Sequence, residues 1–157
     1  MSFLLANDGV DGKAGSAFMV KNGQNIELFG LKKYTTDAEI LTSEFPVVGS
    51  RVNQEKPKGI KYSGTLTVYY GTPEFLNILT EYKRTGRFPE INFQVINQDT
   101  GSSVGSQIIA IYGVTLKKIP IAMLDDSADA LQEEIPFTFT DYEVLESFHK
   151  PSQLGGN

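Results

Sequence analysis

The chain has 157 residues, of which 40% are hydrophobic and 21% are charged, and these values fit one soluble globular domain spanning residues 1–157. It contains no cysteine, which excludes a disulfide framework, a thiolate zinc site and a cysteine nucleophile. Its formal net charge of −5 disfavours general binding to nucleic acid. No stretch approaches the roughly 20 apolar residues of a membrane-spanning helix, and the N-terminus does not resemble a signal peptide, so we expect synthesis in the cytoplasm.

The first third of the chain predicts strands joined by turns. Residues 1–15 read as a flexible segment. Asn22-Gly23 lies between two apolar runs, which is a strong hairpin signal because both central positions of the turn need a positive φ. Residues 31–45 are rich in Thr and mixed in polarity, which predicts a strand with two partly solvated faces. The next segment, residues 46–60, contains two prolines and many polar residues, and predicts a long irregular loop.

A strand followed by the one clear helix comes next. Residues 62–70 alternate between apolar side chains and Ser, Thr or Tyr, which is typical of a half-buried strand. Thr72 is a suitable N-cap and Pro73 suits the first helical position. Apolar residues then recur at helical spacing, and Gly86 follows as a C-terminal signal. The pattern predicts a helix over about residues 73–85 whose apolar stripe lies on a sheet.

The rest of the chain predicts more strands and no second helix of comparable strength. Residues 91–124 read as a strand, then a flexible loop, and then a long strand. Residues 135–145 read as the clearest strand of the sequence, in which Ile135, Phe137 and Phe139 alternate with threonines. Residues 149–157 read as a frayed tail. The predicted fold is therefore mainly β, a sandwich or barrel with one packed helix.

The sequence offers no constellation of catalytic or metal-ligating residues. His149 is the only histidine and lies in the tail, so neither a Ser-His-Asp triad nor a histidine-based metal site can be assembled. We therefore predict that the protein is not an enzyme and needs no cofactor. Charge is segregated, since residues 125–146 carry eight acidic and no basic residues while Lys and Arg gather earlier in the chain. This pattern favours a protein that contacts other proteins, with acidic and basic surfaces meeting between copies.

Two segments resemble the tail tube proteins of contractile phages, in particular those of PBSX-type phage-like elements and contractile bacteriocins. The first is a Val-x-Gly-x-Arg segment that leads through a Lys- and Gly-containing loop into Gly-x-Leu-Thr-x-Tyr. Its residues here are Val47 or Val48, followed by Gly49, Arg51, Lys56, Lys58, Gly59, Gly64, Leu66, Thr67 and Tyr69. The second runs from Gly113-Val114 through Ile119-Pro120 and Leu124-Asp125 to residues 134–139, "EIPFTF". Together they cover roughly residues 42–144.

The resemblance implies a tail-tube-like β-sandwich with a flanking helix and a structural role. Such subunits form hexameric rings, and two hairpins of each subunit complete an inner β-barrel. The rings stack into a hollow tube inside a sheath, above a baseplate, and the tube is driven through the target envelope when the sheath contracts. The resemblance also implies contacts between subunits or rings at Val48, Gly49, Arg51, Lys56 and Lys58. The protein would then reside in a virion or a phage-tail-like particle.

The polar faces of the predicted strands suggest which residues line the lumen of such a tube. Thr65, Thr67, Thr138 and Thr140 present short hydroxyl side chains opposite the apolar faces of their strands. Such groups offer no bulky surface to DNA passing through the lumen without specific binding, and acidic neighbours would repel phosphate. We therefore predict that these four threonines face the lumen.

Two alternatives remain open at the level of the sequence. One is the tube of another injection machine, such as a secretion system or a non-contractile tail. The other is a monomeric β-barrel that binds a small ligand, which requires an enclosed apolar cavity and predicts a stable monomer.

Overall fold

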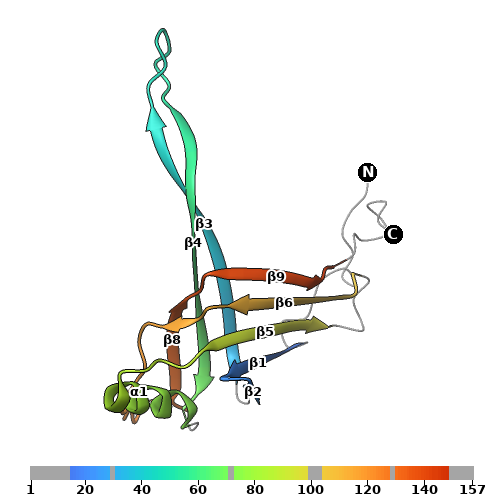
Figure 1. Ribbon diagram of the computed structural model, residues 1–157, viewed down its shortest axis with the longest axis vertical. Helices are drawn as coiled ribbons and strands as arrows, with labels where there is room; N and C mark the ends of the chain where they lie inside the picture. The colour runs from blue at the N-terminus through green and yellow to red at the C-terminus, as the bar shows by residue number, and fades with distance from the viewer. Residues whose placement is uncertain (1–14, 29–30, 71–72, 99–103, 128–129, 149–157) are drawn as a thin grey trace.

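The computed structural model describes residues 15–28, 31–70, 73–98, 104–127 and 130–148, which form nine strands and one helix (Figure 1). This confirms the prediction of a mainly β fold with one helix. In chain order the elements are β1 Gly15–Lys21, β2 Gln24–Glu27, β3 Leu31–Phe45, β4 Gln54–Tyr69, α1 Glu74–Thr85, β5 Ile91–Gln98, β6 Ser106–Tyr112, β7 Thr115–Leu116, β8 Gln132–Thr138 and β9 Asp141–Glu146.

The strands form two antiparallel sheets that pack on each other. One sheet has the order β2-β1-β5-β6-β9, and the other has the order β3-β4-β8-β7. The strands of the first sheet run across those of the second, and α1 lies at one end of the molecule beside β4 and β8 (Figure 1). The arrangement confirms a β-sandwich, and it leaves β2, β9, β3 and β7 as edge strands within the described residues.

The core lies between the two sheets and is closed at one end by the helix. Its largest fully buried side chains come from both sheets and from α1: Met19, Leu66, Phe75, Ile78, Ile91, Phe93, Ile111, Ile135 and Phe137. At the centre, the rings of Phe93 and Phe137 meet edge to face with centroids 5.1 Å apart. The predicted inward direction of Ile135, Phe137 and Phe139 is thus confirmed, since all three are buried.

Local signals in the sequence place the β1–β2 hairpin and the helix correctly. Asn22 and Gly23 both have a positive φ, and Lys21 pairs directly with Gln24 across the two-residue turn. The helix ends at Gly86, whose φ of 74° is left-handed and whose N–H donates to the carbonyl of Tyr82. At the other end Pro73 occupies the N-cap instead of the first helical position. Thr72, the predicted N-cap, lies outside the described residues.

The prediction of a loop over residues 46–60 is wrong in its second half. β4 begins at Gln54, and Phe45 pairs with Gln54, so the irregular connection covers only residues 46–53. Pro57 and Gly59 suggested a loop, but the antiparallel pairing with β3 carries the strand past both of them. The register shifts between Leu41 and Thr42, which accommodates an extra residue in β4 at this point.

The outer parts of β3 and β4 form a two-stranded arm that extends far beyond the sandwich (Figure 1). We define the arm as residues 38–61. Every residue of this range that belongs to β3 or β4 is solvent-exposed. At its root, the ring of Tyr62 stacks on Phe139 at 5.0 Å and meets Tyr142 edge-on at 5.8 Å. These aromatic contacts seal the core where the arm leaves it.

Two long strands predicted from the sequence are each divided between the sheets. The segment 106–124 forms β6 and then turns at Gly113, with a φ of 69°, before the short β7 joins the other sheet. Likewise, β8 and β9 belong to different sheets, and Thr140 lies between them. The alternation of apolar and polar side chains continues across both points where the chain changes sheets. The sequence pattern alone therefore does not reveal these changes.

One carboxylate is buried on the core side of β8. Glu133 is 3% exposed, and its Oε2 atom has no hydrogen-bond partner among the described residues. Burial disfavours the charged form and raises the pKa of Glu133 above its ordinary value of 4.5. At a pH below that ordinary value, both the folded and the unfolded chain hold the proton. As the pH rises, the unfolded chain releases its proton first, so the stability of the fold falls with rising pH and stays lower once the pH has passed the folded-state pKa of Glu133.

We therefore expect the Glu133→Gln variant to be more stable than the original protein at neutral pH. At about pH 3, well below the ordinary pKa of 4.5, the carboxyl is protonated in both states, and the difference in melting temperature is expected to shrink toward zero. Thermal unfolding followed by circular dichroism at both pH values checks this. A variant that is less stable at neutral pH would show that the charged carboxylate is stabilised by a partner.

Candidate assembly surfaces

The tip of the arm is an ordered turn that presents two valines and one cation. The Ser50 N–H donates to the carbonyl of Val47 at 3.1 Å, and the Ser50 side chain accepts from the Val52 N–H at 3.1 Å. Gly49 has a φ of 85°, which explains why glycine is suited to that position. Val48 and Val52 are held outward in solvent, and Arg51 is the only charged residue of the connection 46–53.

The structure places the five predicted contact residues together at the outer end of the arm. Val48, Gly49 and Arg51 lie in the connection, whereas Lys56 and Lys58 lie on β4. All five are exposed, and none of the three cations forms an ion pair with a described residue. Their grouping fits a contact surface, and their role in contacts between subunits stays a prediction.

Apolar side chains are also exposed along the arm. Ile40 and Ile60 are 62% and 58% exposed although they are direct cross-strand partners. A two-stranded hairpin is at best marginally stable in water when nothing covers it. Exposed apolar surface on an isolated arm is therefore typical of a site that binds another protein.

Three of the four predicted lumen residues share one surface. Thr65 and Thr67 lie on the face of β4 opposite the buried Leu66 and Val68. Thr138 joins that face, since it is the β8 partner of Ser63. They therefore point away from the core, on the outer side of the four-stranded sheet. Whether this side lines a lumen stays a prediction.

Thr140 does not belong to this surface. It lies in the crossover between β8 and β9, where its N–H and its side-chain hydroxyl both donate to the carbonyl of Tyr112. Its side chain also covers Gly113 so closely that a Cβ at that position would collide with the Thr140 hydroxyl. These contacts fix Thr140 against the end of β6, where the chain enters the five-stranded sheet.

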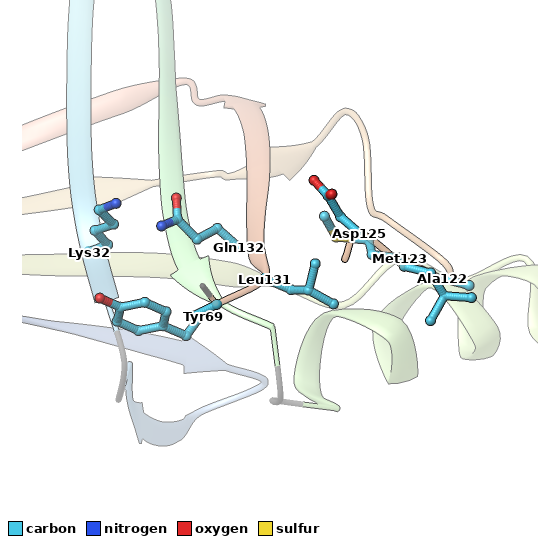
Figure 2. A pocket seen from close by; sticks show the side chains of 9 residues that line it. Lys32, Tyr69, Ala122, Met123, Asp125, Leu131 and Gln132 are labelled. Carbon is cyan, nitrogen blue, oxygen red and sulfur yellow. The ribbon is translucent and has the colours of Figure 1, made fainter. Parts of the chain in front are cut away.

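A hollow of about 860 Å³ lies at the opposite end of the molecule from the arm tip. Figure 2 shows Tyr69 and Lys32 on one side of it, the segment from Ala122 to Asp125 on the other, and Leu131 between them. We call it the Tyr69 hollow, and its main lining residues are Lys32, Tyr69, Met123, Leu124, Asp125 and Leu131.

A second hollow of about 830 Å³ follows the free edge of β3. It lies between residues 31–37 of β3 and the strands β1, β5 and β6 of the facing sheet. Both hollows are open to solvent, so neither supplies the enclosed cavity that a monomeric ligand-binding barrel requires. An open groove beside an edge strand instead suits pairing with a further strand.

No metal-binding cluster is found among the described residues. In that part of the chain, no group of three or more His, Asp or Glu side chains is placed to hold a metal ion. Among the described residues, α1 is the one helix, and it is too short to span a membrane. His149 lies outside the described residues.

Sequence reasoning predicted β3 with its bounds, but it missed the outer part of β4, the role of Tyr62 at the arm root and the Tyr69 hollow. Alternation along a strand tells which side chains share a face, but it does not tell where the covering sheet ends. Tyr69 and Leu124 therefore read as ordinary strand residues, although they are 48% and 99% exposed. Both residues belong to the two motifs that resemble a known family, Tyr69 to the first and Leu124 to the second, and this was the available signal.

Comparison with known proteins gives the family. A family model described as "Phage tail tube protein" matches residues 2–146. "Phage-like element PBSX protein XkdM" of Bacillus subtilis (strain 168) is 32% identical over 143 residues, which cover 91% of this chain and 95% of that protein.

Two solved structures share the fold at low sequence identity. A chain in the 6-fold symmetrised baseplate of the anti-feeding prophage has a TM-score of 0.65 at 12% identity and covers 87% of this chain and 95% of its own length. A chain of the sheath-tube complex of an extracellular contractile injection system, PVC, has a TM-score of 0.65 at 10% identity, with 90% and 94% covered. The match along nearly the whole sequence, together with the shared fold, shows that this chain belongs to the phage tail tube protein family.

Proposed function

We propose that this protein is the subunit of the inner tail tube of a contractile phage tail or a phage-tail-like particle. Six copies form a ring, rings stack into a hollow tube, and the tube is driven through the target envelope when the surrounding sheath contracts. Family membership supports the tube role. The 6-fold symmetry and the sheath in the titles of two structures of the same fold favour hexameric rings and a sheath partner.

The observation that carries this proposal is the uncovered arm. Residues 38–61 extend from a well-packed sandwich into solvent with apolar and cationic side chains unpartnered among the described residues. Together with four edge strands and a groove beside β3, this leaves surfaces that neighbouring subunits can complete. In a protein that stays monomeric, these exposed apolar side chains and strand edges would have no binding partner.

The proposal extends to the partners and the place of the protein. Sheath and baseplate proteins contact the outside and the end of the tube, and the subunit is made in the bacterial cytoplasm before it joins the particle. The lumen is lined by the face that carries Thr65, Thr67 and Thr138. In a particle that delivers DNA, the DNA passes this face without specific binding. No reaction is catalysed at any step.

Electron microscopy of the purified protein tests the assembly class. We expect negative-stain images at high concentration to show rings with sixfold symmetry or hollow tubes, with light-scattering masses well above that of one chain. The protein should also extend a pre-formed baseplate when no template-free tubes form. A strictly monomeric protein that fails in both assays would overturn the proposal.

The charge of the arm tip gives a sharper prediction. Arg51→Glu is expected to reduce tube formation strongly, because it places an anion where a cation is proposed to meet another subunit. The melting temperature of the subunit should change little, since Arg51 is exposed and makes no ion pair with a described residue. Tube yield by sedimentation and thermal unfolding measure the two effects.

Arg87→Glu is the matched control. It makes the same change of charge at another exposed arginine, located after α1 and away from the arm. If Arg51→Glu and Arg87→Glu reduced the tube yield equally, net charge would explain the loss and the position of Arg51 would not.

A further inference from the structure

The arm tip and the Tyr69 hollow cannot meet within one chain. β4 runs from Gln54 at the tip end to Tyr69 at the hollow, and its 16 residues span about 50 Å at roughly 3.4 Å per residue. The two features therefore lie at opposite ends of the longest dimension of the molecule (Figure 1). Any contact between them must join different copies.

The tip is shaped as a small protruding knob. Val48 is fully exposed and Val52 is 72% exposed, so both offer apolar surface to a partner. Arg51 lies between them in the sequence and adds one cation. The hydrogen bonds of Ser50 hold the turn in shape, so little conformational entropy would be lost when the knob binds.

The Tyr69 hollow offers the complementary chemistry. Leu124, Leu131 and the ring of Tyr69 supply apolar surface, and Asp125 supplies an anion. The cation Lys32 also lines the hollow, on the side away from Asp125 (Figure 2). The Asp125 Oδ1 atom accepts hydrogen bonds from the N–H of Ser127 at 3.0 Å and from its hydroxyl at 2.7 Å. These bonds lower the pKa of Asp125, so it is ionised at neutral pH. They engage only Oδ1 and leave Oδ2 available to a cation.

We propose that the Tyr69 hollow is the docking site for the arm tip of another copy of this chain. Val48 and Val52 pack against Leu124, Leu131 and Tyr69, and Arg51 pairs with Asp125. The proposal rests on the proposed tube function and names the acceptor surface of the arm. Because knob and hollow are different surfaces, each docked copy still presents a free hollow or a free knob, and the contact propagates in one direction along the stack.

The absence of cysteine allows a specific crosslinking test. The full-length Val48→Cys/Leu124→Cys double variant carries one thiol on the knob and one in the hollow. Oxidation of assembled protein is expected to give a ladder of covalent dimers, trimers and longer chains on non-reducing gels, since a disulfide requires Cα atoms within about 7 Å. A mixture of the two single variants should give heterodimers and no longer species. Each single variant alone should give no covalent dimer.

The Val48→Cys/Leu145→Cys double variant is the control. Leu145 is an exposed leucine on β9, at 50%, and does not line the hollow. Tubes that form normally but crosslink only through Leu145→Cys, or not at all, would overturn the docking site and leave the tube function intact. A protein that neither assembles nor extends a baseplate would overturn both. A ladder from Val48→Cys/Leu124→Cys, with no ladder from the Val48→Cys/Leu145→Cys control, supports the docking site.

Discussion

Replacement of Phe137 by alanine is expected to lower the free energy of unfolding by about 3–5 kcal/mol. The ring is completely buried at the centre of the sandwich and contacts the rings of Phe93, Tyr34 and Phe139. Truncation removes these contacts and leaves a cavity that the two sheets cannot close. Since a domain of this size has a total stability of about 5–15 kcal/mol, the loss is a large fraction of it. Urea unfolding of the subunit at low concentration measures the change.

Phe45→Ala is the matched control for this prediction. It makes the same chemical change at the outer end of the arm, where Phe45 is 44% exposed. Its effect on the unfolding of the subunit is expected to stay below about 1 kcal/mol. If both variants lost similar stability, the core would not be centred on Phe137.

Removal of the arm except for its first residues at the root is expected to abolish tube formation and to leave the subunit folded. Residues 40–60 can be replaced by Asn-Gly, because Glu39 and Lys61 are direct cross-strand partners and a two-residue turn can join them. Tyr62, which seals the core against Phe139, is kept. Sedimentation and electron microscopy should show no tubes, while the circular dichroism spectrum and the cooperative thermal transition persist.

A smaller deletion separates the tip from the arm strands. Replacing residues 46–53 by Asn-Gly joins the partners Phe45 and Gln54 and removes the knob but keeps both strands. If docking depends on the knob, this variant loses tubes as well. Tubes from the small deletion but not from the large one would assign assembly to the arm strands instead. Normal tubes from both variants would contradict any role for the arm.

Features set by short-range chemistry could be predicted from the sequence. Asn22-Gly23 adopts the positive φ angles that define the β1–β2 hairpin, and Gly86 ends α1 because a residue without a Cβ accepts the left-handed conformation. The inward face of β8 followed from the alternation of Ile135 and Phe137. The absence of cysteine and the single histidine, together with the family motifs, indicated a structural role.

Only the tertiary structure decided how far strands run and which surfaces stay uncovered. β4 continues through Pro57 and Gly59 because it pairs with β3 along this stretch, and local sequence propensity does not contain this information. The chain changes sheets at Gly113 and near Thr140, so a continuous alternation was divided between two layers and Thr140 became a crossover residue. The Tyr69 hollow joins residues far apart in the sequence, and such surfaces depend on long-range packing that periodicity does not encode.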